Sequence, residues 1–286
     1  VFTLKARRPL WLSALRRADL CINTNQDFAN RLWLFWLNYF TVSEANNNGT
    51  CIPHFHEMIR KNMFGSMSDL VFKVVSHSAM LLYLDNNNST GDKSKARKQK
   101  WTTDGTNENL ARETLELFTV TPINGYTQED VINAAYIMTG WGMVGWKKGQ
   151  GEAKKIGYQG SLHEPGTHEV LGKKYKSSGF DKKTRGKKQL RQLIEDLCAR
   201  EDCRNFIALK LCRHFICDNP SKEMIKTVTD AWLKSKGSLI DIHKAVLEAA
   251  WKYGETEEKF LSPETWLIQI ARMTGADWPG DPQIFE

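Results

Sequence analysis

Apolar residues recur every three or four positions along most of the chain, and this spacing places them on one face of an α-helix. The clearest case is the range 27–39, whose shared face consists of Phe28, Leu32, Phe35, Trp36 and Tyr39. The same spacing predicts helices from 188 onward and over 53–62, 68–84, 107–119, 127–138, 206–216, 224–233, 239–251 and 263–273. We therefore predict a mainly α fold, a multi-helix globular bundle that forms a single α-helical domain over residues 1–286, with Trp33 and Trp36 in its core.

The range from about 143 to 188 breaks the helical pattern. Glycines, lysines and short apolar pieces alternate there, and they predict an irregular excursion that could contain a small hairpin. The net charge of +7 is concentrated in this excursion, as the lysine pairs 147–148, 154–155, 173–174, 182–183 and 187–188. Such a segment can bind acidic polymers through counterion release, although lysine-rich loops are also common as solvated surface. No recognition helix, zinc finger or RNA-stacking motif accompanies it, so we do not expect specific nucleic-acid binding.

Composition narrows the class of protein. With 41% hydrophobic and 26% charged residues, the chain is typical of a globular protein. No apolar run approaches the ~20 residues that a membrane span needs. The chain starts at Val1 without a visible signal sequence, so we interpret it as a fragment or a processed form of a longer protein.

None of the six cysteines forms a C-x-x-C pair, which disfavours a zinc site. An even number permits disulfides in an oxidising compartment. Cys198 and Cys203 could bridge across a turn between two helices, while free buried thiols are the equal alternative for the other cysteines.

The range 107–119 gathers acidic and amide side chains on one predicted helix, with Thr106 expected as its N-cap. Its apolar stripe consists of Leu110, Thr114, Leu117 and Phe118, flanked by Ala111. The other side carries Glu108, Arg112 and Glu116, with Asn109 and Glu113 beside them. Two interpretations stay open: a solvated Glu–Arg–Glu ladder worth roughly a few tenths of a kcal/mol per pair, or a buried polar cluster at a functional site.

Histidines and an oxygen-rich loop offer further candidates. His77 lies inside the predicted helix 68–84, and His163 precedes Glu164 in a loop. A loop histidine beside a carboxylate can act as a general base, because its pKa lies near neutrality. His54 and His56 are not expected to share a metal, since residues i and i+2 of a helix point apart. The loop 85–92 lacks the turn glycine and the closing glutamate of an EF-hand.

Common catalytic motifs are absent. The chain has no G-x-S-x-G, no H-E-x-x-H, no Walker A loop and no G-x-G-x-x-G before a helix. A di-iron or di-manganese carboxylate centre needs Glu-x-x-His on two helices, whereas the central range offers Glu113-x-x-Glu116. A divalent metal therefore stays open as a cofactor, without a motif to support it.

Several motifs occur in a characteristic order: 31–33, 38–43, 77–85, 107–119, 125–131, 139–141, 163–166 with 171–172, and 210–215. Together they resemble the bacterial domain-of-unknown-function family numbered eighteen hundred, over nearly the whole chain. The resemblance implies a mainly helical fold, frequent export from the cytoplasm and genes that lie beside those of sulfatase-like partners. It implies no particular reaction.

Three positions depart from the pattern of this family. The family usually has histidine at Tyr39, proline at Ser78 and often histidine at Phe118, so a catalytic role of either missing histidine would leave this chain impaired. The polar positions that still match form our candidate constellation: His77, Glu108, Arg112, Glu113, Glu116, His163 and His214.

Two hypotheses from different classes follow. The first is an extracytoplasmic enzyme, periplasmic or secreted, that acts as a hydrolase or with metal assistance. Glu108, Glu113 and Glu116 would serve as acid, base or metal ligand. Arg112 would hold an anionic group or tune the carboxylates, and His77 and His163 would carry protons. The second is a non-enzymatic binding or scaffolding module, which would recognise an acidic glycan or a partner protein encoded nearby through the lysine-rich excursion.

Overall fold

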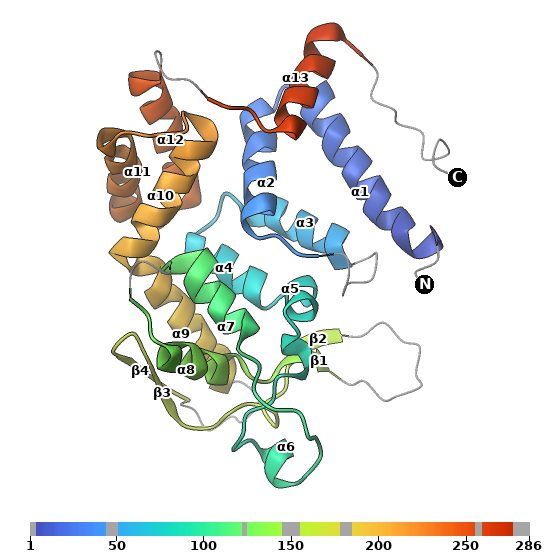
Figure 1. Ribbon diagram of the computed structural model, residues 1–286, viewed down its shortest axis with the longest axis vertical. Helices are drawn as coiled ribbons and strands as arrows, with labels where there is room; N and C mark the ends of the chain where they lie inside the picture. Colours follow the sequence, from blue (N-terminus) through green and yellow to red (C-terminus); the bar gives the residue numbers. More distant parts are fainter. Residues whose placement is uncertain are drawn as a thin grey trace.

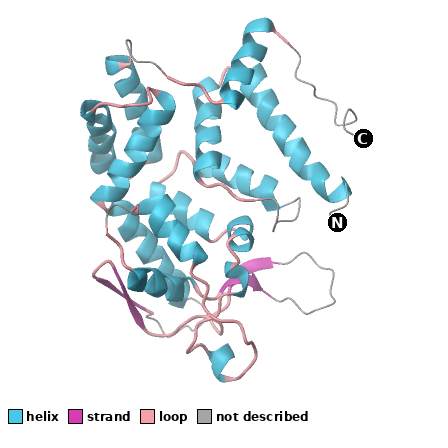
Figure 2. Ribbon diagram, viewed as in Figure 1, coloured by secondary structure: helices cyan, strands magenta, loops and turns pink. Residues whose placement is uncertain are grey.

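The computed structural model describes residues 4–43, 51–121, 125–144, 155–177, 185–254 and 259–276. Helices make up most of these ranges: α1 (Leu4–Asn23), α2 (Asp27–Tyr39), α3 (Cys51–Asn62), α4 (Met67–Val75), α5 (Ser78–Tyr83), the 3₁₀ turn η1 (Asn86–Asn88), α6 (Lys95–Lys98), α7 (Asn109–Glu113), the π-helix η2 (Thr114–Thr119), α8 (Gln128–Met138), α9 (Arg185–Ala199), α10 (Glu201–Phe215), α11 (Lys222–Ser235), α12 (Leu239–Tyr253) and α13 (Pro263–Thr274). Figure 2 shows how small the strand content is beside them. The predicted mainly α fold is confirmed.

The helices form groups that Figure 1 separates clearly. In the upper half of the view, α11 packs against both α10 and α12 on the left, and α1 packs against α13 on the right. Helices α2 and α3 lie between these groups and the rest of the molecule. There α7, α8 and α9 lie with the hairpin formed by β3 (Thr167–Val170) and β4 (Lys173–Lys176). Within the described ranges, every helix is too short or too polar to span a lipid bilayer, as predicted.

The core is one contiguous cluster of apolar side chains. Trp36 is fully buried, its ring stacks on Phe40 with centroids 5.6 Å apart, and its Nε1 donates to His243 Nε2 at 3.2 Å. Phe118 of η2 packs edge-on against Phe40 at 5.3 Å. The prediction that Trp33 and Trp36 lie in the core is confirmed, and their helix α2 is thereby fixed against both the central segment and α12.

The predicted helix 68–84 is in fact two helices, α4 and α5. The chain breaks at His77, whose backbone is extended and whose Nδ1 accepts the N–H of Ala79 at 3.1 Å. This capping bond starts α5 by satisfying one of its unpaired donors. The apolar residues on both sides of the break face the same core, so their helical spacing continues through it and conceals it in the sequence.

The central helix also differs from its prediction. The expected cap is wrong, because Thr106 Oγ1 donates to the carbonyl of Thr90 at 3.2 Å and the helix starts only at Asn109. From Thr114 the helix widens into π-turns, whose hydrogen bonds span five residues instead of four. This widening buries Leu115 and leaves Leu117 48% exposed. The predicted apolar stripe is therefore wrong at Leu117.

The excursion, predicted to be irregular with room for a small hairpin, contains two antiparallel strand pairs within its described residues. β1 (Trp141–Val144) pairs with β2 (Lys155–Tyr158), and β3 (Thr167–Val170) pairs with β4 (Lys173–Lys176). Asp130 fixes the second hairpin to α8, since its Oδ1 accepts the N–H of Leu171 at 2.6 Å. Its other oxygen closes a capping box with Thr127, so this one side chain sets both the start of α8 and the position of β3–β4.

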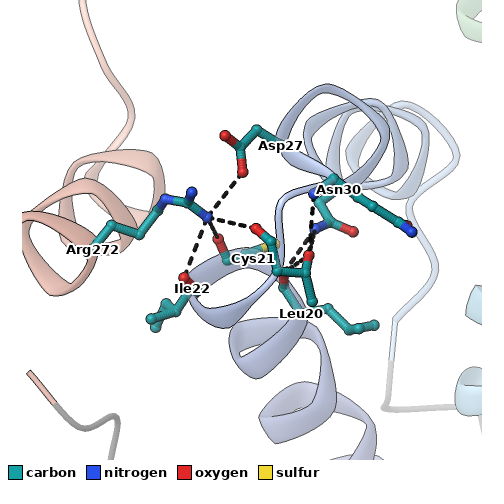
Figure 3. Close-up of polar contacts among 8 residues, drawn as sticks. Leu20, Cys21, Ile22, Asp27, Asn30 and Arg272 are labelled. Carbon is teal, nitrogen blue, oxygen red and sulfur yellow. Dashed lines mark hydrogen bonds and ion pairs between the residues drawn. The ribbon is translucent and has the colours of Figure 1, made fainter. Parts of the chain in front are cut away.

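Arg272 joins α13 to the end of α1 (Figure 3). Its Nη1 donates to the carbonyls of Cys21, Ile22 and Thr24 at 2.9, 3.2 and 3.0 Å, and it lies 2.9 Å from Asp27 Oδ1. The last carbonyls of a helix lack partners within it and carry the negative end of its dipole. The Arg272 guanidinium donates to these carbonyls and places a positive charge at the negative end of the dipole. It thereby holds together two helices that are far apart in the sequence.

Candidate functional site

The first turn of the central helix carries a hydrogen-bonded triad. Arg112 Nη2 lies 3.1 Å from Glu108 Oε2 and 2.8 Å from Gln128 Oε1, while Gln128 Nε2 donates to the same Glu108 oxygen at 2.7 Å. The charged side chains are 43% and 36% exposed, so water screens the pair and its net stabilisation is small. The triad therefore orients these groups at the junction of α7 and α8 without burying them.

One turn further on, the carboxylates of Glu113 and Glu116 are neighbours at half-buried positions. Burial and the negative charge of Glu116 raise the pKa of Glu113 above its ordinary value. The Tyr126 hydroxyl donates to Glu116 Oε2 at 2.9 Å. The two carboxylates, three residues apart, thus have different surroundings: the pKa of Glu113 is raised, and Glu116 accepts a hydrogen bond from a phenol.

The π-turns that carry this pair are held by threonine hydroxyls. Thr114 Oγ1 donates to the Leu110 carbonyl at 2.7 Å, and Thr119 Oγ1 donates to the Thr114 carbonyl at 2.6 Å. Both threonines are fully buried. Insertions of π geometry occur often at functional sites, and here the insertion comes directly after Glu113.

Tyr39 supports the same segment from α2. Its hydroxyl donates to the carbonyl of Phe118 at 3.1 Å, so two of the positions that depart from the family pattern are in contact. Burial, together with the nearby Cys203 and Cys198, raises the pKa of Tyr39 well above its ordinary value. Both side chains belong to an aromatic cluster and act here as packing groups behind the carboxylates.

His77 lies apart from the glutamates. Its Nδ1 accepts the N–H of Ala79, so its proton must be on Nε2, which lies 3.0 Å from His54 Nδ1. Burial and His54 lower the pKa of His77 to about 4. The described contacts of His77 include none to Glu108, Glu113 or Glu116, and a ring with this tautomer has no free lone pair for a metal.

His163, in a loop of the excursion, is buried. Its Nδ1 lies 3.1 Å from the Thr139 carbonyl, and its Nε2 lies 3.0 Å from Gln189 Oε1. The Gln189 amide is oriented by its own donation to the Tyr175 carbonyl at 2.8 Å, so both ring nitrogens face acceptors. Burial nevertheless lowers the pKa of His163. The ring ties α8 to α9 and leaves neither nitrogen open to a substrate.

Glu164 belongs to a second acidic cluster, which the sequence did not indicate beyond its place next to His163. Its Oε2 accepts the N–H of Lys93 at 2.7 Å, and burial with nearby Asp92 raises its pKa. Asp92 in turn accepts the Tyr136 hydroxyl at 3.0 Å. With an exposure of only 3%, Glu164 holds the loop before α6 in place instead of meeting solvent.

The remaining candidates also lie away from the central carboxylates. His214 packs edge-on against Phe35 with ring centroids 5.2 Å apart, and burial with nearby Arg31 and Lys259 lowers its pKa to about 4. In the part of the chain that the structure describes, no group of three or more His, Cys, Asp or Glu side chains is arranged to hold a metal ion. All six cysteines carry reduced thiols.

Two of the described lysines of the excursion, both on β4, form ion pairs. Lys173 Nζ lies 2.7 Å from Asp196 Oδ2, and Lys174 Nζ lies 3.9 Å from Glu169 Oε2. The pairs 147–148 and 182–183 and residue 154 lie outside the described residues. The candidate site is thus the α7–η2 face with Glu108, Arg112, Glu113 and Glu116, joined by Tyr126 and Gln128, which sequence reasoning missed because they come from beyond a turn.

Comparison with known proteins agrees with the resemblance seen in the motifs. The profile of the family described as "Protein of unknown function (DUF1800)" matches residues 4–284. Neither the curated proteins nor the solved structures gave a match to this chain. Since the family profile covers almost all of the sequence, the chain belongs to the DUF1800 family of proteins of unknown function.

Proposed function

We propose that the protein is a hydrolase that works by proton transfer between carboxyl groups on the α7–η2 face. The carrying observation is the pair Glu113 and Glu116, in which burial and mutual repulsion favour a proton on Glu113 while Tyr126 donates to Glu116. In a pair of carboxyl groups, the one whose surroundings raise its pKa can serve as the general acid while the other serves as the base.

In this mechanism Glu113 donates its proton to the leaving group, and Glu116 takes a proton from the attacking water. Tyr126 orients the Glu116 carboxylate through its hydrogen bond. Arg112 is neutralised by Glu108 and held by Gln128, so the face carries an excess of negative charge. We therefore infer a neutral or cationic substrate, because an anionic one would be repelled.

The test is a panel of neutral chromogenic substrates, comprising an aryl glycoside, an aryl ester and an aryl amide, with purified protein. We expect hydrolysis of at least one of them, and a fall in kcat of about 10²–10⁴-fold for Glu113→Gln or Glu116→Gln, the usual worth of a general acid or base. Glu129→Gln, at an exposed position on α8, is the matched control and should keep its activity. Turnover of none of the substrates, or equal turnover by Glu113→Gln and wild type, would refute the proposal.

We further propose that this activity lies outside the cytoplasm. The support is the family membership, since the motif resemblance implies frequent export. Expression of the full-length gene product followed by cell fractionation tests this part separately: recovery in the cytoplasmic fraction would count against export and leave the proposed chemistry untouched.

A further inference from the structure

Two thiols face each other at the corner between α9 and α10. Cys198 lies in the last turn of α9 and Cys203 in the first turn of α10, and the Cys203 thiol shares a hydrogen bond with Cys198. Both side chains are buried, with exposures of 5% and 0%. The chain itself therefore holds the two sulfurs together before any bond joins them.

The two sulfurs differ in their access to a cavity. Cys198 lines a cavity of about 240 Å³ beside Arg204, Glu195 and Trp232, whereas Cys203 does not line it. The hydrogen bond to Cys198, together with burial, raises the pKa of Cys203 well above its ordinary value, so Cys203 stays in its thiol form. Cys198 is the sulfur that a small oxidant in the cavity can reach.

We propose that Cys198 and Cys203 form a peroxide-reactive pair, in which Cys198 is oxidised first and Cys203 then closes an intramolecular disulfide. The Cys198 sulfur attacks a hydroperoxide, which breaks the O–O bond and gives a sulfenic acid and water. The Cys203 sulfur attacks that sulfenic acid, and a second water leaves as the S–S bond forms. Overall two thiols lose two hydrogens, and one hydrogen peroxide becomes two waters.

Oxidation would link the end of α9 to the start of α10. The closed loop of the chain is short, so the expected gain is modest: a rise in Tm of about 5 °C. This proposal does not depend on the proposed hydrolase activity, because neither cysteine serves as its general acid or its general base.

The first experiment needs no variant. Native protein is treated with hydrogen peroxide in slight excess, and intact mass and non-reducing peptide maps are recorded. We expect a loss of about 2 Da and a cross-linked peptide that contains Cys198 and Cys203. A fully reduced pair in folded, peroxide-treated protein, or linkage to other cysteines, would overturn the proposal.

The order of the steps is tested with dimedone, which traps sulfenic acids. In Cys203→Ser the label should appear on Cys198, whereas Cys198→Ser should leave Cys203 unlabelled. Cys212→Ser, at a buried cysteine on the same helix as Cys203, is the matched control and should still form the Cys198–Cys203 link. Labelling of Cys203 in Cys198→Ser, at the rate seen for Cys198, would contradict the assigned order.

Discussion

Lowering the pH from 7 to about 4.5 is expected to unfold the protein, because buried histidines are needed in their neutral form. His243 Nε2 accepts from Trp36 Nε1, and His77 Nδ1 accepts from the Ala79 N–H. His56 Nδ1 lies 3.1 Å from Arg17 Nη1. Indole, amide and guanidinium nitrogens only donate, so each ring must offer a lone pair that protonation would remove.

The direction follows from the lowered pKa values. Burial lowers the pKa of His243 to about 3, burial and His54 lower that of His77 to about 4, and burial with Arg17 lowers that of His56 to about 4. In the unfolded chain histidine titrates near 6.5. Below that pH the unfolded state binds more protons than the folded state, so stability is complete above about pH 6.5 and falls as the pH drops towards 4.

The expected size is about 1.4 kcal/mol per pH unit for each such histidine, against a total stability of roughly 5–15 kcal/mol. Urea denaturation at pH 7.5, 6.5, 5.5 and 5.0 measures it. In His243→Gln the amide oxygen can still accept the hydrogen bond from Trp36, but the side chain does not titrate. The free energy of unfolding of this variant should therefore fall less steeply as the pH is lowered, with a slope that corresponds to the uptake of about one proton fewer. A variant with the wild-type slope, or a wild type that is more stable at pH 5 than at pH 7, would contradict this account.

Gly140→Ala is expected to destabilise the fold by about 2–5 kcal/mol. Gly140 has a φ of +82°, and a Cβ there would lie 2.7 Å from the Gln159 carbonyl oxygen and 3.1 Å from the His163 nitrogen. Backbone strain for a non-glycine residue costs about 1–2 kcal/mol, and overpacking adds about 1–3 kcal/mol. Both neighbouring atoms are backbone, so the clash has no flexible side chain to relieve it.

Gly172→Ala separates the two contributions. Gly172 has a φ of +76°, but a Cβ there meets nothing within 4 Å, so only the strain of about 1–2 kcal/mol should appear. Chemical denaturation of both variants at pH 7.5 gives the comparison. Equal losses in the two variants would show that the close approach of Gly140 to the excursion contributes nothing.

Much of the fold could be predicted from spacing alone. The predicted ranges 27–39 and 127–138 agree with α2 and α8, because the apolar faces of both helices meet a core. The break at His77 could not be predicted, because a histidine cap lies outside the usual set of Ser, Thr, Asp and Asn.

The candidate site was predicted only in part. Glu108 and Arg112 pair as the i, i+4 spacing suggested. The π-turns after Glu113 could not be predicted, because they depend on the buried hydroxyls of Thr114 and Thr119 and on Tyr39 from another helix. The partners of the carboxylates come from beyond a turn, and the pairing of His77 with His54 joins α3 to α5. Such tertiary contacts have no local signature.

The central claim is that burial and the negative charge of Glu116 raise the pKa of Glu113. Titration of the Glu113 side-chain carboxyl by ¹³C NMR, in wild type and in Glu116→Gln, tests it most directly. We expect the pKa of Glu113 to lie above the value of about 4.3 for a solvated glutamate and to fall when the neighbouring charge is removed. A Glu113 that titrates at or below that value, or one that does not respond to Glu116→Gln, would contradict the account.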